Sequence, residues 1–180
     1  GFSTEAVAEQ TLALMFAVIR RIPIGDREVR ENGLVITASE DDGRFLGFDI
    51  KGKTLGVLGL GSIGTRVAEL GLALGMKVVA YNRTPRKIPN VMMLSLDEVL
   101  KISDIISVNL ALTHETEYII SHRELNLMKR SAVLINTAAA PHIDEQALCK
   151  ALIEKRIFGA GLDLLTTEGA DNPLIDLDNI

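Results

Sequence analysis

Three closely spaced glycines have the arrangement of a phosphate-binding turn. Gly59, Gly61 and Gly64 form the pattern G-x-G-x-x-G directly after a short apolar run over residues 54–58. In a dinucleotide-binding unit the first glycine permits a tight turn and the second lets the backbone approach a pyrophosphate. The third lets a helix lie close to the sheet. The pattern therefore predicts a site for a dinucleotide phosphate group.

The residues around these glycines supply the strand, helix and strand that such a turn needs. Residues 54–58 have the apolar character of a buried parallel strand, and residues 77–81 repeat it. Between them, apolar and small residues recur at the spacing of one helix face: Val67, Leu70, Gly71 and Leu74. The free N–H groups of Ser62 and Ile63, at the start of that helix, would face the anion. A lone glycine pattern has little specificity, but in this order it predicts a Rossmann-type unit.

The end of the second strand bears on the choice of cofactor. An acidic residue at this position normally binds the ribose hydroxyls of NAD. The chain instead has Asn82, Arg83 and Thr84, which offer hydrogen-bond donors and a positive charge to a 2′-phosphate. We therefore expect NADP as the cofactor, with NAD as the second choice. The alternative is that Arg83 and Arg86 are solvated loop charges, because some NAD enzymes also lack the acid.

The composition excludes several classes of function. The 180 residues carry a net charge of −5, so no basic surface indicates nucleic-acid binding. No apolar stretch of membrane-spanning length is free of charges, and no metal-ligand pattern is present. The single Cys149 lies in a helical pattern, which favours a packed thiol over a reactive one. We expect a cytoplasmic protein without nucleic-acid, membrane or metal partners.

The first fifty residues are predicted to form a helix and a connecting arm. Residues 3–21 have the pattern of one helix, capped by Ser3 or Thr4, and residues 12–19 are apolar on every side. Such a helix must be buried all round, inside the domain or against another subunit, and we favour the interface of a homodimer. Residues 23–52 are interrupted by glycine and aspartate, which indicates an arm with a short helix near residues 27–31 that lies on something else.

Strands and helices alternate through the rest of the chain. Strands are expected over residues 91–94, 105–110, 132–136 and 157–164, and helices after capping boxes at 95–98 and 121–124 and over 144–155. This alternation predicts an α/β fold, a Rossmann-type doubly wound parallel sheet with helices on both faces. Ligands of such sheets collect at the carboxyl ends of the strands.

Three segments taken together resemble the NAD(P)-binding domain of the D-2-hydroxyacid dehydrogenases. They are residues 51–64, 125–137 and 159–163, and residues 7–14 resemble the long helix that precedes the cofactor domain in that family. The resemblance covers essentially all 180 residues, and its motifs do not separate glyoxylate and hydroxypyruvate reductases from phosphoglycerate or formate dehydrogenases. It implies hydride transfer between NAD(P)H and a small 2-oxo or 2-hydroxy acid.

The resemblance also implies a domain organisation. Family members have a substrate domain built from both ends of the chain, and residues 172–180 resemble the segment that leads to the family's catalytic histidine. We therefore expect residues 1–180 to form a single dinucleotide-binding domain, with 1–22 as its long helix and 23–52 as its arm. The substrate domain is expected to lie outside both ends.

Roles of individual residues follow from the family pattern. Ala139 stands where the family has an arginine that binds the substrate carboxylate and polarises its carbonyl. Glu168 matches a glutamate that raises the basicity of the catalytic histidine, although Gly169 replaces the usual proline. Asp163 resembles a residue that contacts the nicotinamide amide, and Thr137, at a strand end, is counted with the cofactor-binding residues.

Simpler roles remain open for several of these residues. Glu168 is equally consistent with a solvated loop carboxylate, and Asp163 with a helix or turn cap. His114 and His142 lie near strand ends and are candidates for a general acid, although a lone histidine is more often a surface or packed residue.

Two classes of function are consistent with these residues. The first is the cofactor domain of an NAD(P)-dependent oxidoreductase, in which the 180 residues alone are inactive because the arginine and histidine are missing. The second is a dinucleotide-sensing or corepressor-like binding protein on the same fold, in which Ala139 marks lost catalysis. A third explanation for Ala139 is an engineered or strain-specific change in a working enzyme.

Overall fold

The computed structural model describes residues 3–33, 43–166 and 172–180. The elements are α1 (Thr4–Ile19), α2 (Ile22–Asn32), β1 (Thr54–Leu58), α3 (Ser62–Ala73), β2 (Lys77–Tyr81), β3 (Val91–Met93), α4 (Leu96–Ile102), β4 (Ile105–Val108), α5 (His122–Leu127), β5 (Val133–Asn136), η1 (Ala140–His142), α6 (Glu145–Ile153) and β6 (Gly159–Leu162). The predicted alternation of strands and helices is present from β1 to β6 except between β2 and β3, which are joined by a loop without a helix.

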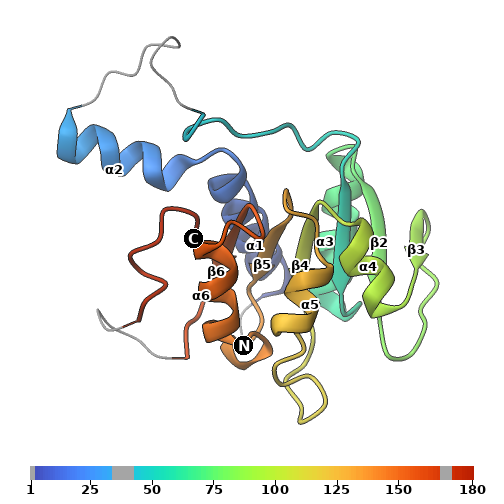
Figure 1. Cartoon of the computed structure of the whole chain (residues 1–180). Helices are drawn as coiled ribbons and strands as arrows, with labels where there is room; N and C mark the ends of the chain where they lie inside the picture. Colours follow the sequence, from blue (N-terminus) through green and yellow to red (C-terminus); the bar gives the residue numbers. More distant parts are fainter. Residues whose placement is uncertain (1–2, 34–42, 167–171) are drawn as a thin grey trace.

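In the described part of the chain, six strands form one parallel sheet in the order β3-β2-β1-β4-β5-β6 (Figure 1). The first three strands extend the sheet in one direction from β1, and the last three extend it in the other. The order therefore reverses between β1 and β4, which confirms the doubly wound topology. A crevice at the carboxyl ends of the strands is expected at such a reversal.

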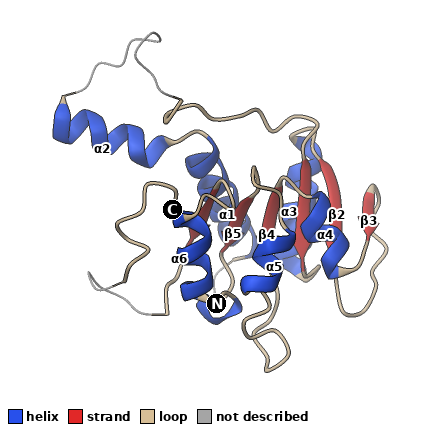
Figure 2. Ribbon diagram, viewed as in Figure 1, coloured by secondary structure: helices blue, strands red, loops and turns tan. Residues whose placement is uncertain are grey.

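Helices cover both faces of this sheet (Figure 2). Helices α1 and α3 pack on one face, and α4, α5 and α6 contribute to a second hydrophobic core on the other. Neighbouring residues of β5 belong to opposite cores, Val133 and Ile135 to the first and Leu134 to the second. Because both faces are buried, each strand needs apolar residues at successive positions, which is why the strands appear as continuous apolar runs.

Helix α1 is buried on one side by this chain itself. Ser3 caps it by accepting a hydrogen bond from the Ala6 N–H (3.1 Å), and its inner face packs on α3, β5 and β6. The expectation that it is buried all round does not hold within one chain, since Ala13 is exposed and Leu14 and Ala17 are only half-buried. In the part of the chain that is described, no helix is both long and apolar enough to cross a membrane.

The arm contains a longer helix than the sequence indicated. We expected a short helix near residues 27–31, but α2 begins at Ile22, with Pro23 in its first turn, and runs to Asn32. Proline fits the first turn because the N–H it lacks has no partner there. The helix is mostly polar, and an exposed ion pair between Asp26 and Arg30 (2.8 Å), four residues apart on one helix face, supports it.

The end of the arm packs against this chain itself rather than against a partner subunit or another domain. The Phe48 ring packs edge-on against the Phe158 ring, with centroids 5.3 Å apart. The Gly47 backbone approaches α1 so closely that a Cβ there would lie 2.1 Å from the Ile19 carbonyl oxygen. These contacts hold the approach to β1 against the α1 side of the sheet.

Asp104 joins elements at the amino edge of the sheet, opposite the glycine turn. Its carboxylate accepts a hydrogen bond from the Thr54 N–H (2.9 Å) and pairs with the Lys129 ammonium (2.9 Å). Burial opposes the charged form, but these two partners outweigh it and hold the pKa of Asp104 below its usual value.

Candidate dinucleotide site

The strand register places the candidate residues in one row. Leu58 at the end of β1 is aligned with Tyr81 of β2 and Val108 of β4, and the alignment continues to Asn136 of β5 and Leu162 of β6. The residues that follow these five strand ends therefore lie along one edge: Gly59, Asn82, Asn109, Thr137 and Asp163. Backbone hydrogen bonds from the N–H groups of Gly59, Asn109 and Asp163 extend the ladder into this row (2.7–3.0 Å).

Each glycine of the turn has a different steric environment. Gly59 has φ of +94°, which disfavours any other residue, and a Cβ there would lie 2.7 Å from the Asn109 carbonyl oxygen. A Cβ on Gly64 would lie 1.9 Å from the Gly59 carbonyl oxygen, so this glycine allows α3 to pack against the turn. A Cβ on Gly61 would meet no atom of the chain within 4 Å. The fold therefore explains Gly59 and Gly64, whereas Gly61 keeps clear a space outside the chain's own packing.

The start of α3 offers backbone donors to an anion. Gly61 is the N-cap, and no side chain caps the helix, so Ser62 and Ile63 present their N–H groups at its first turn. Helices α1 and α6, by contrast, are capped by the side chains of Ser3 and Asp144. Because a helix N-terminus carries a partial positive charge, this uncapped turn suits a phosphate group.

Asn82 joins the glycine turn to the end of β2. Its Oδ1 atom accepts a hydrogen bond from the Leu60 N–H (2.9 Å), and its Nδ2 group donates to the Thr84 carbonyl oxygen (2.5 Å). We expected the Asn82 side chain to offer a donor to a ribose phosphate. In this structure the side chain fixes the position of the turn relative to the loop that begins at Arg83, and its contact with a phosphate stays a prediction.

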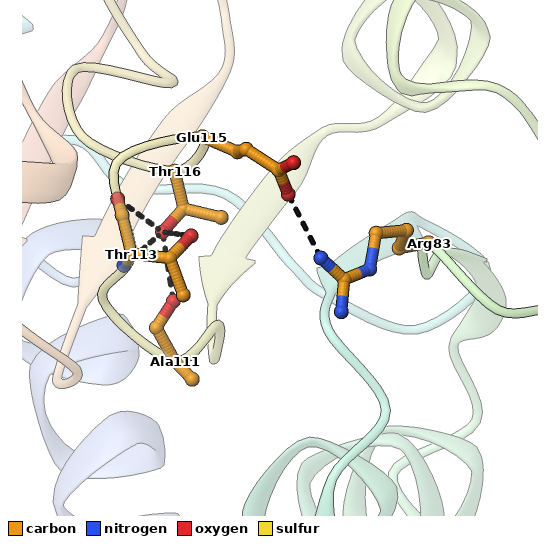
Figure 3. Close-up of polar contacts among 5 residues, drawn as sticks. All are labelled: Arg83, Ala111, Thr113, Glu115 and Thr116. Carbon is orange, nitrogen blue, oxygen red and sulfur yellow. Dashed lines mark hydrogen bonds and ion pairs between the residues drawn. The ribbon is translucent and has the colours of Figure 1, made fainter.

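Arg83 forms an ion pair across the row. Its guanidinium lies 2.8 Å from a carboxylate oxygen of Glu115, in the loop after β4 (Figure 3). The two side chains are 80% and 70% exposed. The position after β2 is the one expected for contact with the adenosine ribose, but no local pattern indicates Glu115 as its partner.

Helix α1 contributes two polar residues to the row. The Thr11 hydroxyl lies 2.7 Å from the Thr137 hydroxyl, and the Gln10 Nε2 group donates to the Asp163 carboxylate (3.0 Å). Both contacts orient residues that we had assigned to cofactor binding. Sequence reasoning missed Gln10 and Thr11; the available signal was a run of polar residues at 9–11, directly before the apolar part of the helix.

The loop after β5 is held by its own side chains. The Asn136 Nδ2 group donates to the Ala139 carbonyl oxygen (2.9 Å), and His142 Nδ1 lies 3.0 Å from the same oxygen. The His142 ring has no solvent exposure and its Nε2 atom has no partner among the described residues, so it cannot deliver a proton to a substrate. His114, the other histidine candidate, is exposed. Ala139 is half-exposed and has no group that could bind a carboxylate.

Glu168 lies outside the described residues. The described residues that flank positions 167–171 are held by the side chain of Glu145, at the start of α6. Its carboxylate accepts hydrogen bonds from the Thr166 N–H (2.5 Å) and the Asn172 Nδ2 group (3.1 Å). Among the residues that are described, no three His, Cys, Asp or Glu side chains form a metal-binding group.

These features fit a dinucleotide. The turn at Gly61 leaves space for a pyrophosphate beside uncapped backbone N–H groups. Arg83 follows β2, the strand next to β1, where it could contact the adenosine end of the ligand. Thr137 and Asp163 occupy the opposite half of the row, beyond β4. The row is therefore consistent with an extended ligand that crosses the sheet edge above β1.

Comparison with known proteins gives the same result. A sequence model described as the D-isomer specific 2-hydroxyacid dehydrogenase, NAD binding domain, matches residues 12–180. A glyoxylate reductase of Aeropyrum pernix is 40% identical over an alignment that covers all of this chain and 56% of the relative. The chain thus spans little more than half the length of this relative.

Solved structures extend the comparison to bound cofactors. An acyclic imino acid reductase (Bsp5) in complex with NADPH and D-Arg has a TM-score of 0.90 and 44% identity, covering 98% of this chain and 56% of that one. A D-isomer specific 2-hydroxyacid dehydrogenase from Lactobacillus delbrueckii ssp. bulgaricus in an NAD complexed form has a TM-score of 0.86 and 30% identity. It covers 99% of this chain and 58% of that one.

Proposed function

This chain belongs to the D-isomer specific 2-hydroxyacid dehydrogenase family through its NAD-binding domain, and we propose that the protein transfers hydride between a nicotinamide dinucleotide and a small 2-oxo or 2-hydroxy acid. The observation that carries the proposal is the glycine turn, where Gly61 keeps space clear beside the uncapped start of α3. The corepressor-like alternative is not favoured, because the relatives are named as reductases and dehydrogenases.

The proposed roles follow the row of strand ends. The N–H groups of Ser62 and Ile63 bind the pyrophosphate, with help from the helix dipole. Asp163, held by Gln10, accepts a hydrogen bond from the nicotinamide amide, and Thr137 lies beside it. When bound, the nicotinamide supplies or accepts the hydride, and the residues of this chain bind and orient it.

We assign NADP as the preferred cofactor, with NAD as the second choice. No carboxylate follows β2 to bind ribose hydroxyls, and Arg83 offers a guanidinium to a 2′-phosphate. Thr84 adjoins it on the same loop. One related structure holds NADPH and another NAD, so the relatives support both cofactors and the preference depends on Arg83.

A second substrate class is favoured by Ala139. A carbonyl substrate needs a cation that polarises it, and Ala139 supplies none. A protonated imine already carries a positive charge on its nitrogen, so its carbon accepts hydride without that cation. One relative is named an acyclic imino acid reductase, and reduction of an imino acid is therefore the second candidate function.

Turnover separates these candidates. NADPH oxidation by the intact protein, with the substrate domain that the family resemblance implies, is followed with glyoxylate, and in parallel with pyruvate plus methylamine, which form an imine in solution. Reduction of glyoxylate supports the first candidate, and Ala139→Arg should then raise kcat/KM by about a hundredfold, the value of one oxyanion-stabilising group. Turnover that requires methylamine and falls in Ala139→Arg supports the second candidate. Absence of turnover with both substrates would contradict the assignment as an oxidoreductase.

The homodimer remains part of the proposal. Leu14 and Ala17 of α1 line an apolar hollow of about 280 Å³ together with the end of β6 and residues near the C-terminus. Apolar surface of this kind is typical of the centre of a subunit interface. Sedimentation of the protein should give the mass of a dimer, and a monomer at high concentration would contradict this assignment. We also retain the cytoplasm as the proposed location, since the one thiol, Cys149, is a buried free cysteine.

A further inference from the structure

The ion pair between Arg83 and Glu115 lies above the glycine turn. Arg83 follows β2 and Glu115 lies in the loop after β4, and these two strands flank β1 in the sheet. The pair therefore joins the loops on either side of the strand that leads into the turn. A cofactor whose adenosine end reaches Arg83 must enter beside this pair.

Glu115 is presented by an ordered turn. The Thr116 hydroxyl accepts a hydrogen bond from the Thr113 N–H (2.8 Å) and donates to the Ala111 carbonyl oxygen (2.7 Å) (Figure 3). The Glu117 N–H also donates to the Thr113 carbonyl oxygen (3.0 Å). These bonds close the loop on itself immediately around Glu115, so its carboxylate is directed toward Arg83 by a defined backbone.

We propose that Glu115 is a specificity-determining residue, which occupies Arg83 as a counter-ion and thereby lowers the affinity for NADPH relative to NADH. This inference rests on the proposed function, in which Arg83 binds the 2′-phosphate. The phosphate and the Glu115 carboxylate are both anions that accept hydrogen bonds from the same guanidinium. NADPH must either displace Glu115 or bind with a carboxylate close to its phosphate, whereas NADH meets neither cost.

The size of the effect follows from the exposure of the pair. Both side chains are mostly solvated, and an exposed ion pair of this kind contributes about 0.2–1 kcal/mol. Displacing it alone corresponds to a factor of about 1.5 to 5 in affinity. Repulsion between the carboxylate and a nearby phosphate adds to this cost, so we expect about two- to tenfold in total.

The test is titration of NADPH and NADH into the unmodified protein, Glu115→Gln and Glu117→Gln. Glu115→Gln removes the charge and keeps the shape of the side chain. Glu117→Gln removes the same charge two residues away in the same loop, and no ion pair of Glu117 is found among the described residues. Thermal melting of the three proteins checks that the fold is retained.

Glu115→Gln should lower the Kd of NADPH by about two- to tenfold and leave the Kd of NADH within about twofold. Glu117→Gln should leave both values unchanged, and the gain should disappear in the double variant Arg83→Ala/Glu115→Gln. Weaker NADPH binding in Glu115→Gln, or equal changes for the two cofactors, would overturn the inference. If the unmodified protein bound neither cofactor, the proposed function itself would fail, which is a different result.

Discussion

Gly61→Asp should abolish dinucleotide binding while slightly stabilising the fold. Gly61 has φ of −70° and ψ of −166°, an extended backbone that any residue adopts, and a Cβ there meets nothing within 4 Å. Aspartate is a better N-cap than glycine and favours the positive end of the helix dipole. We expect a gain of roughly 0.3–1 kcal/mol, or about 1–4 °C in Tm.

The same carboxylate should prevent pyrophosphate binding. It would accept hydrogen bonds from the N–H groups that the phosphate needs, and it would place a negative charge beside another. At about 4 Å and an effective dielectric constant of about 20, one pair of unit charges costs roughly 4 kcal/mol. The Kd of NADPH should therefore rise by at least about a thousandfold.

Gly61→Asn separates the contribution of charge from that of size. Asparagine has nearly the same shape and caps a helix as well as aspartate does, so its Tm should match that of Gly61→Asp within a few degrees. Its loss of affinity should be smaller, because it does not repel the phosphate. Titration calorimetry gives the Kd and differential scanning calorimetry the Tm. A Kd of Gly61→Asp for NADPH within tenfold of the value for the unmodified protein would refute the placement of the pyrophosphate at this turn.

Three further outcomes are expected. Arg83→Ala should weaken NADPH binding by about ten- to a hundredfold and leave NADH binding unchanged, as measured by fluorescence titration; equal affinities before mutation would contradict the assignment. Gly64→Ala should destabilise the fold by about 1–3 kcal/mol, because its Cβ would overlap the Gly59 carbonyl oxygen, and an unchanged Tm would show that α3 can move away. Asp104→Asn should lower the free energy of unfolding by about 1 kcal/mol at neutral pH. Since the pKa of Asp104 is lowered in the folded state, this difference should shrink as the pH falls below about 4, and a constant difference in urea unfolding from pH 7 to pH 3 would contradict it.

The parts of the fold that were predictable are those with local physical causes. The bounds of β1 and β2 match the apolar runs at 54–58 and 77–81, because a strand buried on both faces needs apolar residues throughout. The capping box at Ser95 is present, with Glu98 accepting from the Ser95 N–H (2.9 Å). The strand register then brings residues from distant segments into one row without any further information from the sequence.

The parts that were missed depend on contacts between distant residues. Nothing local indicates that Glu115 pairs with Arg83, or that Gln10 reaches Asp163 from a helix more than a hundred residues earlier. The length of α2 was missed for a local reason instead, because Pro23 and Gly25 were taken to interrupt the chain, whereas both lie at the start of this helix. Side-chain roles at the site therefore required the tertiary structure, whereas the position of the site did not.

Titration calorimetry of the unmodified protein with NADPH and with NADH tests whether the glycine turn binds a dinucleotide. We expect saturable binding of one dinucleotide per chain for both cofactors, with the lower Kd for NADPH. Gly61→Asp, folded by the criterion of its Tm, should give no heat of binding under the same conditions. A folded, unmodified protein that bound neither cofactor at millimolar concentration would contradict the assignment of the glycine turn as a dinucleotide site.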